Sequence, residues 1–215
     1  MFDNLKIDNS LPIEQFLDAY QKLAHKTSGF EEGTWYEYHK TYMVQPTKKE
    51  TSGKHLLMCT LGIIGEYIEF LKSLTTTISL TDPGDTFIDE RFETAKYNTM
   101  LEIGDTIWYI SEMCTWANIK LSEVFSAAST SKNATIYTIG DLAETVKKYM
   151  FHDKAHGFKP MNFLPLFFAE ILEVLMELEI PLHKVLQENI TKLAKRHVEK
   201  FNGLANLNII DSGCI

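Results

Sequence analysis

The sequence has few cysteines, no basic run and no long uninterrupted apolar segment, and each absence excludes a class of protein. Cys59, Cys114 and Cys214 are odd in number and widely spaced, which fits neither a disulfide framework nor a zinc site and favours the cytoplasm. The formal net charge of −8 argues against a nucleic-acid partner. The most apolar stretch, residues 161–176, contains a proline and two acidic residues, so we expect a buried helix and no membrane partner.

Sequence signals for several other functions are also missing. The first residues lack the basic and then apolar pattern of a signal peptide, so we expect none. The chain has no glycine-rich phosphate loop and no serine or cysteine nucleophile motif. Its seven histidines form no Glu-x-x-His pair of the kind that carboxylate-bridged di-iron bundles use.

Apolar residues recur at helical spacing along most of the chain, whereas strand patterns are nearly absent. We therefore predict an all-α helical bundle. A length of 215 residues, a hydrophobic fraction of 45% and a charged fraction of 23% are typical of a globular protein with a real core. We expect residues 1–130 to form one helical region and residues 131–215 to pack on it as part of one compact unit.

The periodicity and its interruptions predict where the helices lie. The expected ranges are 12–26, 54–74, 90–117, 121–128, 139–151, 163–178 and 182–201. Ser10 is expected to cap the first helix and Ser122 the short fourth one. Residues 29–53, rich in aromatic side chains, are expected to form a loop or a short helix.

The chain also suggests a degenerate second helical repeat. Residues 139–150 can be aligned with residues 61–72, which places Glu144 on Glu66 but Lys147 on a glutamate. On this alignment the second copy has kept the helices, lost the acids and become a packing partner.

Two acidic pairs are the most informative pattern: Glu66-x-x-Glu69 and Glu102-x-x-Asp105. Residues three apart lie on the same face of a helix, so each pair can direct two carboxylates to one point. Apolar residues flank both pairs, which indicates that neighbouring helices cover them. Uncompensated charge would be costly there, so a metal or a basic group is needed nearby. Hard divalent cations such as Mg²⁺ suit carboxylate ligands. An ordinary solvated acidic face is the alternative.

Two glycines stand beside the first acidic pair, Gly62 and Gly65. Glycine inside a helix costs about 0.5–1 kcal/mol. We therefore expect these positions to clear space for an ion or a ligand.

The residues around the pairs resemble the all-α, MazG-like nucleoside triphosphate pyrophosphohydrolases. The similar segments are Tyr20-Gln21-x-x-Ala24-x-x-Thr27, Leu61-Gly62-Ile63-Ile64-Gly65-Glu66-x-x-Glu69, Glu102-Ile103-Gly104-Asp105-Thr106-Ile107-Trp108-Tyr109 and Asn189-x-x-Lys192-Leu193-x-x-Arg196. They span residues 18–116 and 182–201. The chain departs from the family at Gly65, where a second glutamate is frequent, and at residues 121–181, which the shortest members lack.

The resemblance implies a hydrolase that cleaves a (d)NTP to the monophosphate and pyrophosphate, with residues 1–130 as the catalytic region. Mg²⁺, or Mn²⁺ in its place, would be held by Glu66, Glu69, Glu102 and Asp105 and would activate a water for attack on the α-phosphorus. Glu69, together with Glu66, is expected to act as the catalytic base that orients this water.

Substrate contacts are expected from Lys72, Trp108, Asn189, Lys192 and Arg196, with Trp35 and Tyr38 as further candidates for stacking on the base. Each of these residues also has a plain structural explanation, as a solvated charge or a core aromatic. The resemblance further implies a homodimer or homotetramer. Two other functions stay open: a catalytically silent helical module that binds a nucleotide or a partner, its acids capped by basic residues, and a ferritin-like redox metal bundle.

Overall fold

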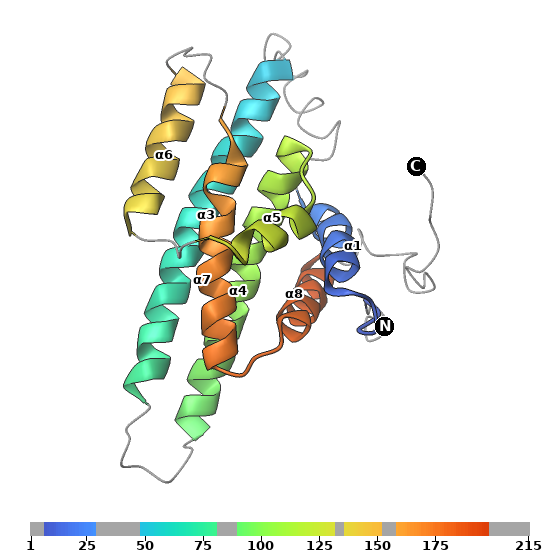
Figure 1. The fold of residues 1–215 in the computed structure, drawn as a ribbon, viewed down its shortest axis with the longest axis vertical. Helices are drawn as coiled ribbons and strands as arrows, with labels where there is room; N and C mark the ends of the chain where they lie inside the picture. Colours follow the sequence, from blue (N-terminus) through green and yellow to red (C-terminus); the bar gives the residue numbers. More distant parts are fainter. Residues whose placement is uncertain (1–6, 29–47, 81–89, 132–135, 152–157, 198–215) are drawn as a thin grey trace.

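The computed structural model describes residues 7–28, 48–80, 90–131, 136–151 and 158–197, and every regular element in these ranges is a helix. In chain order these are α1 (Ile13–His25), α3 (Lys48–Ser79), α4 (Glu90–Ala117), α5 (Leu121–Ala128), α6 (Ile136–Phe151), the short 3₁₀ helix η1 (Pro160–Asn162), α7 (Leu164–Glu177) and α8 (Leu182–Arg196). Figure 1 shows how they assemble into a bundle. The predicted all-α fold is confirmed.

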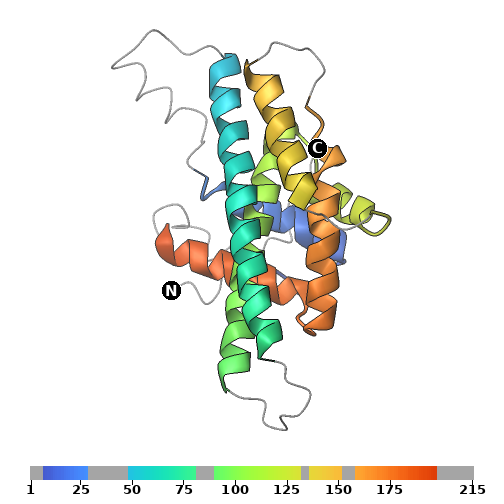
Figure 2. The same ribbon diagram turned by 90° about the vertical axis from the view of Figure 1, so that its left-hand side faces the viewer.

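The two longest helices, α3 and α4, run antiparallel along the length of the molecule (Figures 1 and 2). Their interface is the most extensive between any two described elements. The core takes Ile63, Tyr67 and Phe70 from α3 and Ile103 and Ile107 from α4, each at most 1% exposed. These apolar positions recur every three or four residues, so the hairpin also fixes how the remaining faces of the two helices are oriented.

Helices α1 and α8 pack against each other and against α4, and α8 crosses the hairpin at a steep angle (Figure 2). Gly104 makes this approach possible. A Cβ atom built at Gly104 would lie 3.1 Å from the Asn189 Cβ and 3.2 Å from its Nδ2, which is tighter than ordinary van der Waals contact. The absence of a side chain at Gly104 therefore lets Asn189 lie directly on α4.

Helix α7 confirms that the apolar stretch 161–176 is largely a buried helix, since Phe167 and Phe168 are fully buried. None of the described helices is both long and apolar enough to span a bilayer. Helix α7 packs on α5, whereas α6 packs along α3. Helices of the second half thus pack on the first half, which agrees with the packing role that the repeat predicted, and the repeat itself stays a prediction. Glu144, aligned with Glu66 in that repeat, instead pairs with Lys147 and Lys148 at the surface.

The predicted cap of the first helix is wrong. Helix α1 begins after Pro12, and none of the described side chains caps it. Ser10 is bonded to Asp8 instead: its backbone N–H and its hydroxyl donate to the Asp8 Oδ1 at 2.8 and 2.7 Å. Ser10 therefore takes part in a local turn with Asp8 and does not cap α1.

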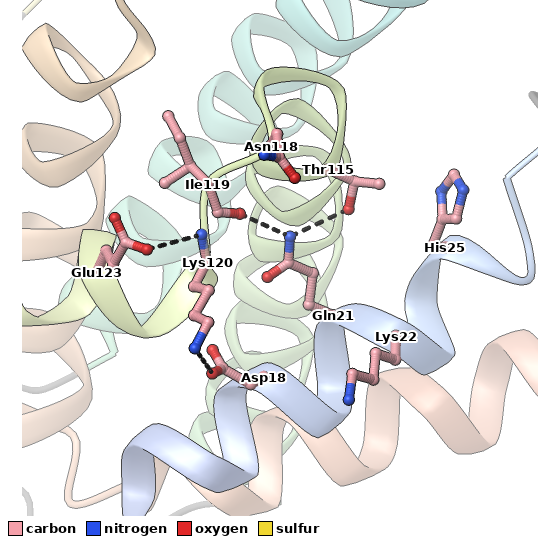
Figure 3. Close-up of a pocket in the computed structure, with 9 residues that line it drawn as sticks. All are labelled: Asp18, Gln21, Lys22, His25, Thr115, Asn118, Ile119, Lys120 and Glu123. Carbon is pink, nitrogen blue, oxygen red and sulfur yellow. Dashed lines mark hydrogen bonds and ion pairs between the residues drawn. The ribbon is translucent and has the colours of Figure 1, made fainter. Parts of the chain in front are cut away.

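The segment that leads into α5 is tied to side chains of α1, and Figure 3 shows Asp18 and Gln21 beside it. The backbone N–H of Leu121 donates to Gln21 Oε1 at 2.7 Å, and that of Ser122 donates to Asp18 Oδ1 at 3.2 Å. Gln21 Nε2 in turn donates to the carbonyl of Ile119 at 3.0 Å. Ser122 thus lies inside α5. Side chains of α1 cap this helix together with its own Glu123, whose Oε1 accepts a hydrogen bond from the Lys120 backbone N–H at 3.4 Å. A cavity of about 510 Å³ lies beside these contacts.

Most helix bounds follow the sequence closely, and 90–117 and 121–128 agree at both ends. Helix α3 is longer than predicted at both ends. It begins at Lys48, inside the segment expected to form a loop or a short helix, and its polar C-terminal end stays helical to Ser79. The Thr75 and Thr77 hydroxyls donate to the carbonyls of Leu71 and Ser73, one turn earlier, at 2.8 and 3.1 Å, and Thr77 also bonds to Thr99 of α4 at 2.9 Å. Helix α6 likewise begins before residue 139. Trp35, Tyr38 and the segment beyond residue 197 lie outside the described residues.

Candidate metal centre

Three carboxylates of the α3–α4 hairpin converge on one point. Glu66 of α3 and Glu102 and Asp105 of α4 each offer an oxygen, and these oxygens lie within 4.8 Å of one another. All three side chains are half-buried. Among the described residues this is the one such group of three potential metal ligands. The i, i+3 spacing on α4 and the antiparallel packing of α3 produce the convergence.

The surroundings raise the pKa of two of these carboxyl groups. For Glu66 the causes are burial, followed by repulsion from Asp105, Glu102 and Glu69. For Glu102 they are burial, followed by repulsion from Asp105 and Glu69. The positive charge of Lys192 acts in the opposite direction and lowers both pKa values. The group therefore carries excess negative charge, which a bound cation would stabilise.

Asp105 is the most strongly held of the three acids. Lys192 Nζ of α8 donates to both of its carboxylate oxygens, and Asn189 Nδ2 donates to Oδ1 at 2.8 Å. The Asn189 Oδ1 accepts a hydrogen bond from the Tyr20 hydroxyl of α1 at 2.9 Å. Because Asn189 is only 2% exposed, this chain of contacts fixes the orientation of Asp105. Two predicted substrate contacts, Asn189 and Lys192, thus lie directly beside the acids.

Three other predicted site residues, Glu69, Lys72 and Arg196, are solvent-exposed. The carboxylate of Glu69 is outside the group that lies within 4.8 Å, yet its charge contributes to the raised pKa of Glu66 and Glu102. Glu69 therefore stands at the rim of the acidic group. Its role as metal ligand and base stays a prediction, as do substrate contacts from Lys72 and Arg196.

Trp108 is turned towards α1. Its indole N–H donates to Thr27 Oγ1 at 2.9 Å and lies 3.3 Å from the carbonyl oxygen of Ala24. Its ring meets that of Tyr109 edge to face, with centroids 4.6 Å apart. These contacts give Trp108 a packing role between α4 and α1, and its predicted contact with a substrate is still a prediction.

The two glycines of α3 differ in what surrounds them. A Cβ at Gly62 would lie 2.1 Å from Cδ1 of Tyr109, so an aromatic ring of α4 occupies the space that we expected an ion or ligand to use. At Gly65, by contrast, no described atom lies within 4 Å of such a Cβ. Open space next to Glu66 is therefore found at Gly65 but not at Gly62.

A second acidic site was missed by the sequence reasoning. Glu112 of α4 is 0% exposed, and its carboxylate meets His25 Nδ1 at 3.1 Å and His55 Nε2 at 3.3 Å. Burial raises the pKa of Glu112, but hydrogen bonds from His25, His55 and Ser28, together with the charge of His25, outweigh burial and lower the pKa to about 2. Glu112 is therefore a buried anion that ties α1 and α3 to α4.

A sequence signal for this second site did exist. Glu112 continues the stripe of Glu102, Asp105 and Tyr109 between apolar flanks, and a carboxylate in such a position requires polar partners. The sequence could not say which partners these are, because His25 lies on another helix and His55 on a third.

Comparison with known proteins does not add to this picture. No family model, curated protein or solved structure matches the chain, so the MazG-like resemblance is a prediction that rests on the motif residues themselves.

Proposed function

We propose that the chain is a Mg²⁺-dependent hydrolase that converts an NTP or dNTP to the monophosphate and pyrophosphate. The observation that carries this proposal is the convergence of Glu66, Glu102 and Asp105 within 4.8 Å. An all-carboxylate ligand set suits a hard ion such as Mg²⁺ or Mn²⁺, and such ions are the usual partners of polyphosphates. In an octahedral Mg²⁺ site opposite ligand oxygens lie about 4 Å apart and adjacent ones about 3 Å apart, so the three side chains would draw closer together to hold one.

A bound divalent ion would supply charge neutralisation for the polyphosphate and a water of lowered pKa. In the reaction, the water oxygen forms a bond to the α-phosphorus while the bond from that phosphorus to the bridging oxygen breaks, and pyrophosphate leaves with the bonding electrons. Glu69, exposed beside the acidic group, is placed in this proposal to orient the water and accept its proton. Glu66 would hold the ion and assist Glu69.

Cationic side chains near the acids would bind the phosphates. Lys192 contacts Asp105, Arg196 follows it one turn later on α8, and Lys72 follows Glu69 on α3. Charge-assisted hydrogen bonds from such groups are among the stronger contacts that a phosphate can make. The triphosphate would therefore lie between α8 and the exposed Glu69 and Lys72 of α3.

The test is product analysis with purified protein, Mg²⁺ and the common NTPs and dNTPs, separated by ion-exchange chromatography. We expect a monophosphate and pyrophosphate, and no reaction after chelation of the metal. Asp105→Asn and Glu102→Gln should each lower kcat/KM at least about 100-fold. Glu144→Gln on the surface of α6 is the control and should react at the wild-type rate. Release of a diphosphate and orthophosphate, or wild-type rates in both site variants, would refute the assignment.

A catalytically silent binding module is the second candidate function. One observation favours it: Lys192 already pairs with Asp105 and so reduces the need for a metal. A protein that cleaves none of the nucleotides, and whose melting temperature does not respond to Mg²⁺, would support the silent module over the hydrolase.

A further inference from the structure

Lys192 is a cation that already occupies the edge of the acidic group. Its Nζ bonds both oxygens of Asp105, and the two side chains are only 20% and 25% exposed. The same positive charge also acts on Glu66 and Glu102. Lys192 therefore balances part of the negative charge that a divalent ion would otherwise have to balance.

Asp105 does not depend on Lys192 for its orientation. Asn189 holds Asp105 Oδ1 at 2.8 Å, and the buried Tyr20 hydroxyl holds Asn189 at 2.9 Å. An ammonium group on a flexible four-carbon stem can leave its partner without any movement of the helix that carries it. Of the two groups that bond Asp105, Lys192 is thus the one that is free to exchange.

We propose that Lys192 is an exchangeable counter-cation, which pairs with Asp105 in the metal-free site and moves to a phosphate oxygen when a metal–nucleotide complex binds. This inference rests on the proposed function. A divalent ion and an ammonium group on one carboxylate repel each other, so they compete for Asp105. The nucleotide phosphates then give the displaced ammonium a new anionic partner.

The expected consequence is positive coupling between metal and nucleotide. Free metal must break the ion pair between Lys192 and Asp105 and gives Lys192 no new partner, so it binds weakly. When nucleotide is present, its phosphates provide that partner and the metal binds more tightly. By linkage, the metal raises the affinity for the nucleotide by the same factor. Such a site would admit the metal–nucleotide complex in preference to free divalent ions.

The test is a titration of the full chain with Mn²⁺, in which the electron paramagnetic resonance signal measures the concentration of unbound Mn²⁺. It is done without nucleotide and then with a triphosphate whose α,β-bridging oxygen is replaced by methylene. Lys192→Met should bind Mn²⁺ alone about tenfold more tightly or better, because the competing charge is gone. In this variant the nucleotide analogue should raise the Mn²⁺ affinity by a smaller factor than in the wild type.

Three further variants make the test specific. Lys192→Gln is a second neutral variant and should behave like Lys192→Met, so the result does not depend on the folding of one protein. Lys192→Arg keeps the charge and should keep the wild-type Mn²⁺ affinity. Lys195→Met removes an exposed cation from the same helix and is the matched control, which should change nothing.

The outcomes separate this inference from the proposed function. If both neutral variants bind Mn²⁺ no more tightly than the wild type, while Asp105→Asn abolishes binding, the metal site stands and the exchange role of Lys192 is overturned. A lysine with a merely structural role would give this result or weaker binding. If neither the wild type nor the neutral variants bind Mn²⁺, the proposed function and the inference both fail.

Discussion

Replacing Glu112 by glutamine is expected to destabilise the fold strongly at neutral pH and much less in acid. The carboxylate is 0% exposed and is held by His25 at 3.1 Å and His55 at 3.3 Å. Glutamine has nearly the same shape but no charge, so Glu112→Gln removes the ionic part of the contact and leaves the packing in place. Breaking a buried ion pair costs about 3–5 kcal/mol when the remaining charge is buried, and because the His25 side chain is 37% exposed we expect the lower end of this range.

The pKa of Glu112 provides an independent magnitude and a pH window. A fall from the ordinary value of 4.5 to about 2 in the folded protein corresponds to about 3 kcal/mol, at about 1.36 kcal/mol per pKa unit. Because the folded-state pKa is depressed, this stabilisation is fully present above pH 4.5 and is lost as the pH falls towards 2. The difference in unfolding free energy between wild type and variant should therefore shrink over the same window.

The assay is urea unfolding followed by far-ultraviolet circular dichroism at several pH values between neutrality and about 3. Glu93→Gln, which changes an exposed glutamate on the same helix, is the control and should stay within about 0.5 kcal/mol of the wild type. Equal stability of Glu112→Gln and wild type at neutral pH would refute the argument. So would a difference that fails to narrow in acid, because the loss could then not be electrostatic.

Two further predictions concern Glu66 and the glycines beside it on α3. Gly62→Ala should destabilise the protein by about 1–3 kcal/mol, because the new Cβ would lie 2.1 Å from the Tyr109 ring. Gly65→Ala should instead stabilise it by about 0.5–1 kcal/mol. Urea unfolding of both variants checks this, and equal changes in unfolding free energy would contradict it. Burial and repulsion raise the pKa of Glu66, so its stabilising contribution is present below pH 4.5 and is lost as the pH rises through the raised value. Glu66→Gln should therefore stabilise the metal-free protein at neutral pH, by at most about 1 kcal/mol after solvent screening. It should also abolish the rise in melting temperature that the proposed function predicts for the wild type in Mg²⁺. A lower melting temperature than wild type without metal would contradict this account.

The sequence predicted the elements whose signals are local. Apolar periodicity set the helices, and the i, i+3 pairs placed Glu66, Glu102 and Asp105 on faces that do converge. The predictions failed where a distant partner decides the outcome. The first backbone N–H groups of α5 donate hydrogen bonds to Gln21 and Asp18 of another helix. The residues near 121 alone do not reveal these partners.

The partners of the buried and half-buried acids were out of reach for the same reason. The contact of Lys192 with Asp105 depends on how α8 crosses α4, and that crossing depends on the missing side chain of Gly104. The sequence showed that these acids needed compensation and suggested a metal. It could not show that a lysine, and for Glu112 two histidines, already provide part of that compensation.

The contacts of Asp105 also bear on how the protein is made. Asp105 and its aligning partner, Asn189, are 84 positions apart, so the ribosome completes the acid-bearing helices well before it releases the segment that steadies them. A nascent chain halted ahead of α8 would hold its carboxylates close together with neither amide nor ammonium to restrain them. Assembly of this pocket is thus expected to be among the last events of biosynthesis. On the proposed function, shortened products should bind divalent ions without discrimination.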